Sequence, residues 1–404
     1  MMKTFIFAIL LLGLSFSAVA QQKQCTILIS FDGFRWDYLD RHLTPTIDSL
    51  WRQGVRASSL EPVYPSKTFP NHLAIVTGMY PEHHGIIQND FWDRPAGRRY
   101  KISDTVEVRD SRWYRGEAIW ETAKKNGKVS ASYFWPGSEI SQDGRHPDYF
   151  ERYDQNRPDG ERVNGVLRWL SLPVEKRPDI ITLYFDATDT QGHRYGPDSP
   201  EVNAAIAQLD SMVALLIRGL DRLKQIDSTN IILVSDHGMT QIDVARTIVI
   251  DEFLAGEKYT TQWNGPTMLL ESGNGRDREI ADILKKKLKH ASVYLKNEVP
   301  EYFHFSKNEH ITPVIIAADL GWSLAPTAVS AKDSAAYGKG NHGYDSREKD
   351  MHGYFVAAGP AFKKSAKVGS LKNIDIYPLI CRVLKIAPNS AADGRLERIH
   401  SVLR

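Results

Sequence analysis

Three apolar segments with the composition of buried β-strands each lead into an aspartate, and this pattern restricts the fold of the 404-residue chain more than any other feature. In open α/β sheets, ligand sites lie beyond the carboxyl ends of the strands. Three carboxylates at three strand ends therefore predict one clustered site. The segments and their aspartates are 26–31 with Asp32, 180–185 with Asp189, and 231–234 with Asp236.

Three histidines occur close to these aspartates or in a similar short polar segment. One lies four residues after Asp189, one follows Asp236 directly, and one stands in a Gly-Asn-His-Gly segment; they are His193, His237 and His342. A single aspartate after a strand is usually a turn residue or a helix cap, so the argument rests on the whole group. Three carboxylates and three imidazoles suit two divalent cations, with zinc the leading candidate.

The local backbone decides whether these side chains can share a metal. Asp189 and His193 have helical i, i+4 spacing, but glycines at 192 and 196 predict a loop there. Adjacent residues on an extended chain point to opposite sides. The Asp236–His237 pair can therefore bind one metal only if the backbone turns, which Gly238 permits.

Strands and helices alternate along most of the chain. Helical periodicity and capping signals predict helices over 45–53, 68–77, 117–125 and 202–223, with a further strand over 129–134. This alternation predicts an α/β fold: a mostly parallel central sheet with helices on both faces. We assign residues 21–404 to a single catalytic α/β domain.

The regular alternation of strands and helices is interrupted between about 265 and 324, where a small α+β lobe is expected. The segment reads as a strand (267–271), a helix (278–289), a strand (292–295) and further strand material (314–318). Residues 354–358 then return to the main sheet, and 374–384 form a closing helix. The lobe is thus predicted as an insertion before His342.

The N-terminus has the pattern of a secretory signal peptide. Lys3 precedes an apolar stretch over 5–14, and Ala18-Val19-Ala20 fits a cleavage site. Residues 1–20 are therefore expected to be removed after Ala20, giving a periplasmic or secreted protein. The alternative, a retained anchor, is disfavoured because the apolar run is shorter than the ~20 residues that a span needs.

Composition limits the partners. The net charge of +2 gives no reason to expect nucleic-acid binding. No later segment is expected to insert stably in a membrane, and the oligomeric state is not determined by the sequence. An exported chain permits a disulfide between Cys25 and Cys381, and two buried thiols are an equal alternative.

Together, the short segments that carry these aspartates and histidines resemble the motifs of the nucleotide pyrophosphatase/phosphodiesterase family of the alkaline phosphatase superfamily. The resemblance covers almost the whole mature chain, and six separated motifs occur in the expected order. The most specific stretch runs from Lys67-Thr68-Phe69-Pro70-Asn71-His72 to His84-Gly85-Ile86-Ile87-Gln88-Asn89. The others are Gly116–Trp120, Phe134–Glu139, Gly192–Pro197, Ser235–Met239 and Gly340–Asp345.

The resemblance implies a role for each matching residue. Thr68 matches the nucleophile, and Asn89 matches the residue that holds a phosphate oxygen, helped by the backbone N–H of Phe69. Phe69 and Tyr184 match an aromatic pair that sandwiches a nucleobase. Asp32, Asp236 and His237, with the Thr68 oxygen, resemble one zinc site, and Asp189, His193 and His342 resemble the other. One departure is Ala187-Thr188, where the family usually has Glu-Pro before the aspartate matched by Asp189.

The implied chemistry is consistent with the residue types. A threonine hydroxyl is a poor nucleophile near neutral pH, but zinc lowers the pKa of a bound oxygen. At a helix N-terminus, Thr68 would also gain free N–H groups and a favourable dipole for a phosphoryl group. In-line attack would give a phosphothreonine, which water then hydrolyses. The plainer interpretations are a helix cap for Thr68 and core packing for Phe69 and Tyr184.

The leading hypothesis is an exported two-zinc phosphodiesterase/nucleotide pyrophosphatase that releases nucleoside 5′-monophosphates. The same chemistry on phospholipid head groups is the close alternative. A phosphomonoesterase is disfavoured because a third-metal ligand set is not evident, and a sulfatase because the Cys/Ser-x-Pro-x-Arg segment is missing. A metal-stabilised, non-catalytic binding protein is the alternative from a different class, and it would need closed coordination shells.

Overall fold

An eight-stranded sheet forms the centre of the computed structural model, which describes residues 23–328 and 338–404. The predicted signal peptide, residues 1–20, lies outside the described residues. The strand order is β19 (Ala366–Val368), β2 (Val55–Ala57), β18 (Phe355–Ala358), β9 (Thr229–Val234), β1 (Cys25–Phe31), β8 (Ile180–Phe185), β6 (Ser130–Tyr133) and β7 (Tyr149–Glu151). From β9 to β7 all neighbours are parallel, whereas β18 is antiparallel to both β9 and β2.

The central strands are apolar throughout because helices cover both faces of the sheet. On β1, Ile27, Ile29 and Phe31 face one hydrophobic core, and Leu28 faces the other. The first core contains residues of α1 (Pro45–Arg52), α5 (Asp159–Leu170) and α7 (Pro200–Arg222). The second contains residues of α2 (Thr68–Thr77), α4 (Ile119–Lys125) and α10 (Ile376–Leu384). The predicted α/β fold is confirmed.

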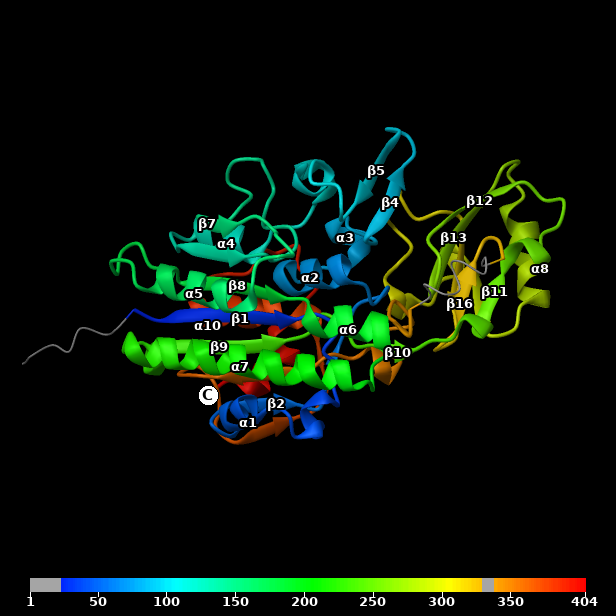
Figure 1. The fold of residues 1–404 in the computed structure, drawn as a ribbon. Helices are drawn as coiled ribbons and strands as arrows, with labels where there is room; N and C mark the ends of the chain where they lie inside the picture. The colour runs from blue at the N-terminus through cyan, green and yellow to red at the C-terminus, as the bar shows by residue number, and fades with distance from the viewer. Residues whose placement is uncertain (1–22, 329–337) are drawn as a thin grey trace, which may run out of the picture.

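Helix α7 is long and apolar enough to cross a membrane by length and composition alone, which the sequence analysis did not anticipate. In the structure it runs alongside β9 (Figure 1). Its apolar stripe, which includes Val202, Leu209 and Leu216, is buried in the core beneath the sheet. The helix is therefore a covering element of the fold.

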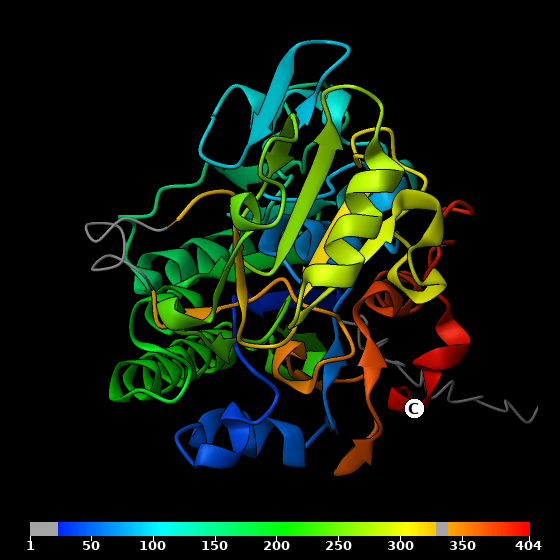
Figure 2. The same cartoon turned by 90° about the vertical axis from the view of Figure 1, so that its right-hand side faces the viewer.

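The small lobe has its own four-stranded antiparallel sheet and its own core. Its sheet order is β12 (Tyr259–Gln262), β13 (Thr267–Ser272), β15 (Val314–Ala318) and β14 (Ala291–Leu295), with α8 (Asp277–Lys287) packed against it. The sheet includes β12, so the lobe begins before the predicted residue 265. Figures 1 and 2 show the lobe beyond the end of the main sheet toward which β1 and β9 point.

Short elements complete the chain around this end of the sheet. They are α3 (Pro81–His84), α6 (Ala187–Tyr195), and the paired strands β4 (Asp90–Asp93) with β5 (Arg98–Lys101), β10 (Thr240–Gln241) with β17 (Gly340–Asn341), β11 (Thr247–Val249) with β16 (Ser323–Ala325), and β3 (Leu60–Glu61) with β20 (Leu371–Lys372).

Both cysteines are buried free thiols. Cys25 lies in the core on the α7 side of the sheet and Cys381 in the core on the α2 side. Burial raises the pKa of each thiol to about 12. Of the two alternatives left by the sequence, the structure shows the unbridged one.

Candidate active site

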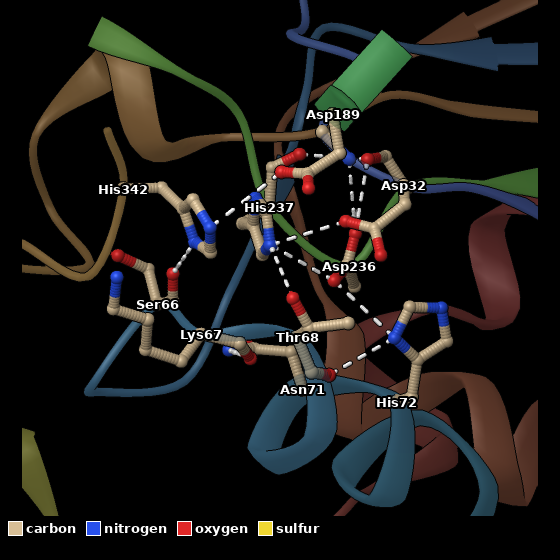
Figure 3. Close-up of polar contacts among 12 residues, drawn as sticks. Asp32, Ser66, Lys67, Thr68, Asn71, His72, Asp189, Asp236, His237 and His342 are labelled. Atoms are coloured by element: carbon tan, nitrogen blue, oxygen red, sulfur yellow. Dashed lines mark hydrogen bonds and ion pairs between the residues drawn. The ribbon is translucent and has the colours of Figure 1, made fainter. Parts of the chain in front are cut away.

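The aspartates that follow β1, β8 and β9 meet at one end of the sheet, because β1 lies between the other two strands. Asp32 and Asp236 form a first cluster with His237 (Figure 3). The His237 Nε2 atom lies 3.3 Å from Asp32 Oδ1 and 3.0 Å from Asp236 Oδ2. The first group of predicted ligands is therefore brought together.

Asp189, His193 and His342 form a second cluster beside the first. Asp189 Oδ1 lies 3.4 Å from His193 Nε2 and 3.5 Å from His342 Nε2, and the two imidazole Nε2 atoms are 3.1 Å apart. The His342 ring stacks on His237 at a centroid distance of 3.5 Å. The clusters therefore adjoin, and all six predicted Asp and His residues share one site.

The three imidazoles are held in the same way. Each Nδ1 lies within hydrogen-bond distance of a backbone carbonyl oxygen: 2.9 Å for His193 to Gly340, 2.8 Å for His237 to Gly238, and 2.8 Å for His342 to Ser66. A carbonyl only accepts, so Nδ1 must carry the proton. With Nδ1 as the donor to the backbone, each ring directs its Nε2 at the cluster, as a metal-binding histidine does.

The carboxylates need compensating positive charge. Within the described chain, one buried oxygen of each aspartate (Asp32 Oδ1, Asp189 Oδ1 and Asp236 Oδ2) has no hydrogen-bond partner. Burial raises the pKa of Asp32 well above its usual value, and Asp236 and Asp189 raise it further. Burial also lowers the pKa of His342, which favours its neutral form. Carboxylate oxygens that lack hydrogen-bond partners and face imidazole Nε2 atoms fit bound divalent cations.

The Asp189–His193 segment is helical, so the predicted loop is wrong. Both residues lie in α6, and their i, i+4 spacing puts them on one face. The packing around Gly192 is close: a Cβ there would lie 3.0 Å from the terminal Cε of the flexible Met239 side chain, and a Cβ on Gly340 would collide with the Gly192 carbonyl oxygen. Thr188, in the unusual Ala187-Thr188 pair, donates a hydrogen bond to the Asp32 carbonyl at 2.6 Å.

The Asp236–His237 pair shares one cluster because the backbone turns after β9. The following residue, Gly238, has no room for a side chain, since a Cβ would collide with the Asp350 carbonyl oxygen. Ser235 supports the turn: its hydroxyl donates to the His237 carbonyl at 2.6 Å and accepts from the Phe34 N–H at 2.9 Å.

Thr68 is the first residue of α2, and its side chain faces both clusters (Figure 3). Thr68 Oγ1 lies 3.3 Å from His237 Nε2. The Phe69 N–H donates to Asn89 Oδ1 at 2.9 Å, so it has a partner that the sequence did not predict. This bond leaves the Asn89 amide nitrogen, which can only donate, for a phosphate oxygen. The helix N-terminus adds a favourable field for an anion at Thr68.

His72 belongs to the site although the sequence analysis gave it no role. Its Nδ1 lies 3.2 Å from Asp236 Oδ2 and 2.9 Å from the Thr68 carbonyl oxygen, and its Nε2 lies 2.9 Å from Ser30 Oγ. The signal was present: His72 is four residues after Thr68, so both lie on one face of α2. The contact identifies His72 as a positioning residue for Asp236.

Tyr184 makes contacts that the sequence analysis did not predict. Its hydroxyl donates to Asp32 Oδ2 at 2.6 Å, its ring lies edge-on to His72, and only 8% of the residue is exposed. Tyr184 lines the active-site cavity but little of its ring is exposed, so its role as a base platform stays a prediction, while its hydroxyl orients the Asp32 carboxylate. Tyr153 is 46% exposed and lines the same cavity as Phe69.

This active-site cavity has a volume of about 400 Å³ and opens beside Thr68 and His193. Phe69, Phe134, Trp135 and Tyr153 give it aromatic walls. The His193 side chain is 40% exposed, so the second cluster is open on the cavity side. Catalytic metal sites keep such an open position, whereas structural ones are closed.

Comparisons with known proteins agree with this geometry. The family model described as type I phosphodiesterase/nucleotide pyrophosphatase matches residues 26–345. Human ectonucleotide pyrophosphatase/phosphodiesterase family member 1 is 38% identical over 387 residues, covering 93% of this chain and 41% of that protein. The chain thus spans less than half the length of that relative.

Solved structures show the same fold. Murine ectonucleotide pyrophosphatase/phosphodiesterase 5 superposes with a TM-score of 0.88 at 32% identity, covering 94% of this chain and 100% of that one. An inactive threonine-to-alanine variant of the murine protein in complex with AMP also gives 0.88, at 31% identity and the same coverage. The chain therefore belongs to the type I phosphodiesterase/nucleotide pyrophosphatase family, whose members are hydrolases of the alkaline phosphatase superfamily.

Proposed function

We propose that the protein is an exported, two-zinc phosphodiesterase/nucleotide pyrophosphatase that releases nucleoside 5′-monophosphates. The observation that carries the proposal is the position of Thr68: its hydroxyl stands at a helix N-terminus, 3.3 Å from His237 and facing both Asp/His clusters. The N-terminal sequence and the ectoenzyme relatives support export.

The two clusters would hold the metal ions. Asp32, Asp236 and His237 would bind one ion together with Thr68, and Asp189, His193 and His342 would bind the other. Oxygen and imidazole donors at these sites suit zinc. When bound, the ions supply Lewis acidity that lowers the pKa of a coordinated hydroxyl and neutralises developing charge.

The residues of the chain arrange the reaction. The Thr68 hydroxyl gives up its proton to solvent and its oxygen attacks phosphorus, so that a threonine O–P bond forms while the bond to the leaving oxygen breaks and the leaving group takes the electron pair. The Asn89 amide donates to a phosphoryl oxygen. Water then attacks the phosphothreonine, which releases the nucleoside monophosphate and returns the proton to Thr68. His72 and Tyr184 keep Asp236 and Asp32 in position.

A substrate panel tests the proposal. Purified protein with zinc should cleave ATP and a dinucleotide at the α-phosphorus and release AMP, measured by chromatography. It should act more slowly on a phosphomonoester, because the cavity offers aromatic walls for a second substituent. Faster cleavage of a lysophospholipid would replace the nucleotide assignment with the head-group one. Zinc binding without turnover of any compound would indicate a binding protein.

The aromatic walls give a second test. Tyr153→Ala is expected to raise the Michaelis constant for nucleotides roughly tenfold to a hundredfold, since base–aromatic stacking is worth about 1–3 kcal/mol. A small aryl phosphodiester without a base should be affected much less.

Tyr184→Phe is the matched comparison for that variant. It keeps the ring but removes the hydrogen bond to Asp32, so it should leave the nucleotide Michaelis constant unchanged. It should weaken metal binding by about 10- to 100-fold, as loss of such supporting bonds does elsewhere. Tyr184→Ala removes the ring as well: a raised nucleotide Michaelis constant in Tyr184→Ala, together with an unchanged constant in Tyr184→Phe and in Tyr153→Ala, would make Tyr184 the platform.

A further inference from the structure

Arg35 makes hydrogen bonds to two distant segments that, like its own loop, lie next to the predicted metal ligands. It follows Asp32 by three residues, in the loop after β1. Its Nη1 donates to the Met239 carbonyl oxygen at 3.2 Å, two residues after His237, in the loop after β9. Its Nη2 donates to Asp198 Oδ1 at 2.8 Å, in the connection that follows α6. One guanidinium therefore joins three segments beside the Asp/His clusters.

A two-point contact fixes this guanidinium within its own loop. The Nε and Nη2 atoms of Arg35 donate to the two carboxylate oxygens of Asp37 at 2.6 and 2.9 Å, and a contact of this kind sets the plane of the guanidinium. Arg35 is only 8% exposed, whereas the Asp198 side chain is 70% exposed, so water screens the ion pair between them. The buried bond to the Met239 carbonyl is therefore the contact with the larger consequence.

Met239 continues this connection to the second cluster. Its buried side chain lies against two glycines, since a Cβ built on Gly192 or on Gly340 would be 3.0 Å from Met239 Cε or Sδ, respectively. Gly192 precedes His193 in α6, and the Gly340 carbonyl accepts the hydrogen bond from His193 Nδ1 at 2.9 Å. A displaced Met239 would therefore disturb both His237, two residues before it, and the packing that holds His193.

The bond between Arg35 and Met239 spans the two loops that supply the first cluster. The loop after β1 carries Asp32, and the loop after β9 carries Asp236 and His237. A metal ion binds more tightly when the free protein already holds its ligands in place, because ordering them on binding costs conformational entropy. A contact that fixes one loop against the other therefore raises metal affinity without touching the metal.

We propose that Arg35 is a positioning residue for the metal site: it holds the loops after β1 and β9, and with them both Asp/His clusters, in the arrangement that binds metal. This inference rests on the proposed function, since it takes the two clusters as the zinc sites. Its test measures zinc affinity and does not depend on turnover.

Zinc affinity is measured on the zinc-loaded full chain by competition with a chromogenic chelator. Arg35→Lys keeps the positive charge beside Asp37 but loses the planar fork that also reaches the Met239 carbonyl. The chelator concentration that removes half of the zinc should fall about tenfold, the lower end of the effect of lost supporting bonds. The effect is limited because Phe34 and Ser235 still join the two loops. The melting temperature of the metal-free protein should stay close to the wild-type value.

Arg41→Lys is the matched control. Arg41 donates to the same Asp198 oxygen at 2.6 Å and to Asn203 Oδ1 at 2.7 Å, and these partners lie just before and within the first turn of α7. Its replacement should leave the chelator concentration unchanged. Equal shifts in the Arg35 and Arg41 variants, or no shift in Arg35→Lys, would overturn the proposal.

Asp37→Asn approaches the same contact from its other side and leaves Arg35 in place. It should shift the chelator concentration in the same direction but by less, because the bond to the Met239 carbonyl remains. A lower melting temperature of the metal-free protein with unchanged zinc affinity in both variants would make Arg35 a structural residue. If the wild-type protein holds zinc but cleaves no phosphodiester, the proposed function fails, whereas the comparison of zinc affinities still decides the role of Arg35.

Discussion

Replacing Thr68 by alanine is expected to lower the rate of phosphodiester hydrolysis by at least about a thousandfold, as loss of a nucleophile does in other covalent hydrolases. The physical reason is that the hydroxyl facing both Asp/His clusters is removed, while the six carboxylate and imidazole groups remain. Metal content, measured by elemental analysis, and the melting temperature should therefore stay close to the wild-type values. Thr68→Ser should keep measurable activity, because a primary hydroxyl occupies the same position.

Thr77→Ala provides the matched control. Thr77 is buried on the same helix, where its hydroxyl donates to the Leu73 carbonyl at 2.7 Å, but it lies at the far end from the site. Its loss should weaken α2 slightly and leave turnover intact. Wild-type rates in Thr68→Ala would refute the covalent mechanism, and equal losses in both variants would make Thr68 a structural residue.

Removal of metal is the second large effect. Dialysis against a strong chelator should abolish activity, release two equivalents of metal per chain and lower the melting temperature, and zinc should restore all three. In the apoprotein Asp32 and Asp236 are buried and Asp189 lies beside them, and burial together with the other two carboxylates raises the pKa of Asp32 well above its usual value. At a metal concentration one hundred times the dissociation constant, binding contributes about 2.7 kcal/mol to the free energy of unfolding.

Variants assign the metals to their clusters. Asp236→Asn and His342→Ala should each lower the zinc stoichiometry by roughly one, since one ligand of each predicted site is lost. Asp210→Asn is the control: this buried aspartate accepts from the Thr46 and Ile47 N–H groups at 3.1 and 2.8 Å, so its loss affects α1 but no metal. Full activity in demonstrably metal-free protein would rule out the two-metal interpretation.

The elements that the sequence predicted best are those with both a periodic pattern and local end signals. Helix α2 begins at Thr68 and ends at Thr77 as predicted, because Gly78 takes the left-handed conformation that stops a helix, with φ of 67°. Strand β8 spans Ile180–Phe185, as its apolar run indicated. The prediction of a loop at Gly192 was wrong, because α6 continues through this residue. Here the small size of glycine serves close packing with Met239 and does not end the helix.

By itself, the sequence determined the α/β architecture and the identity of the six Asp and His residues, since apolar runs, caps and strand-end aspartates are local signals. Only the tertiary structure decided what the surrounding residues do. Tyr184 pairs with Ser30 across β8 and β1, and this register turns both side chains toward His72. Register between strands depends on contacts between distant segments. The contact of His72 with Asp236 and the place of Tyr153 beside Phe69 in the cavity follow from such packing and not from the spacing of residues along the chain.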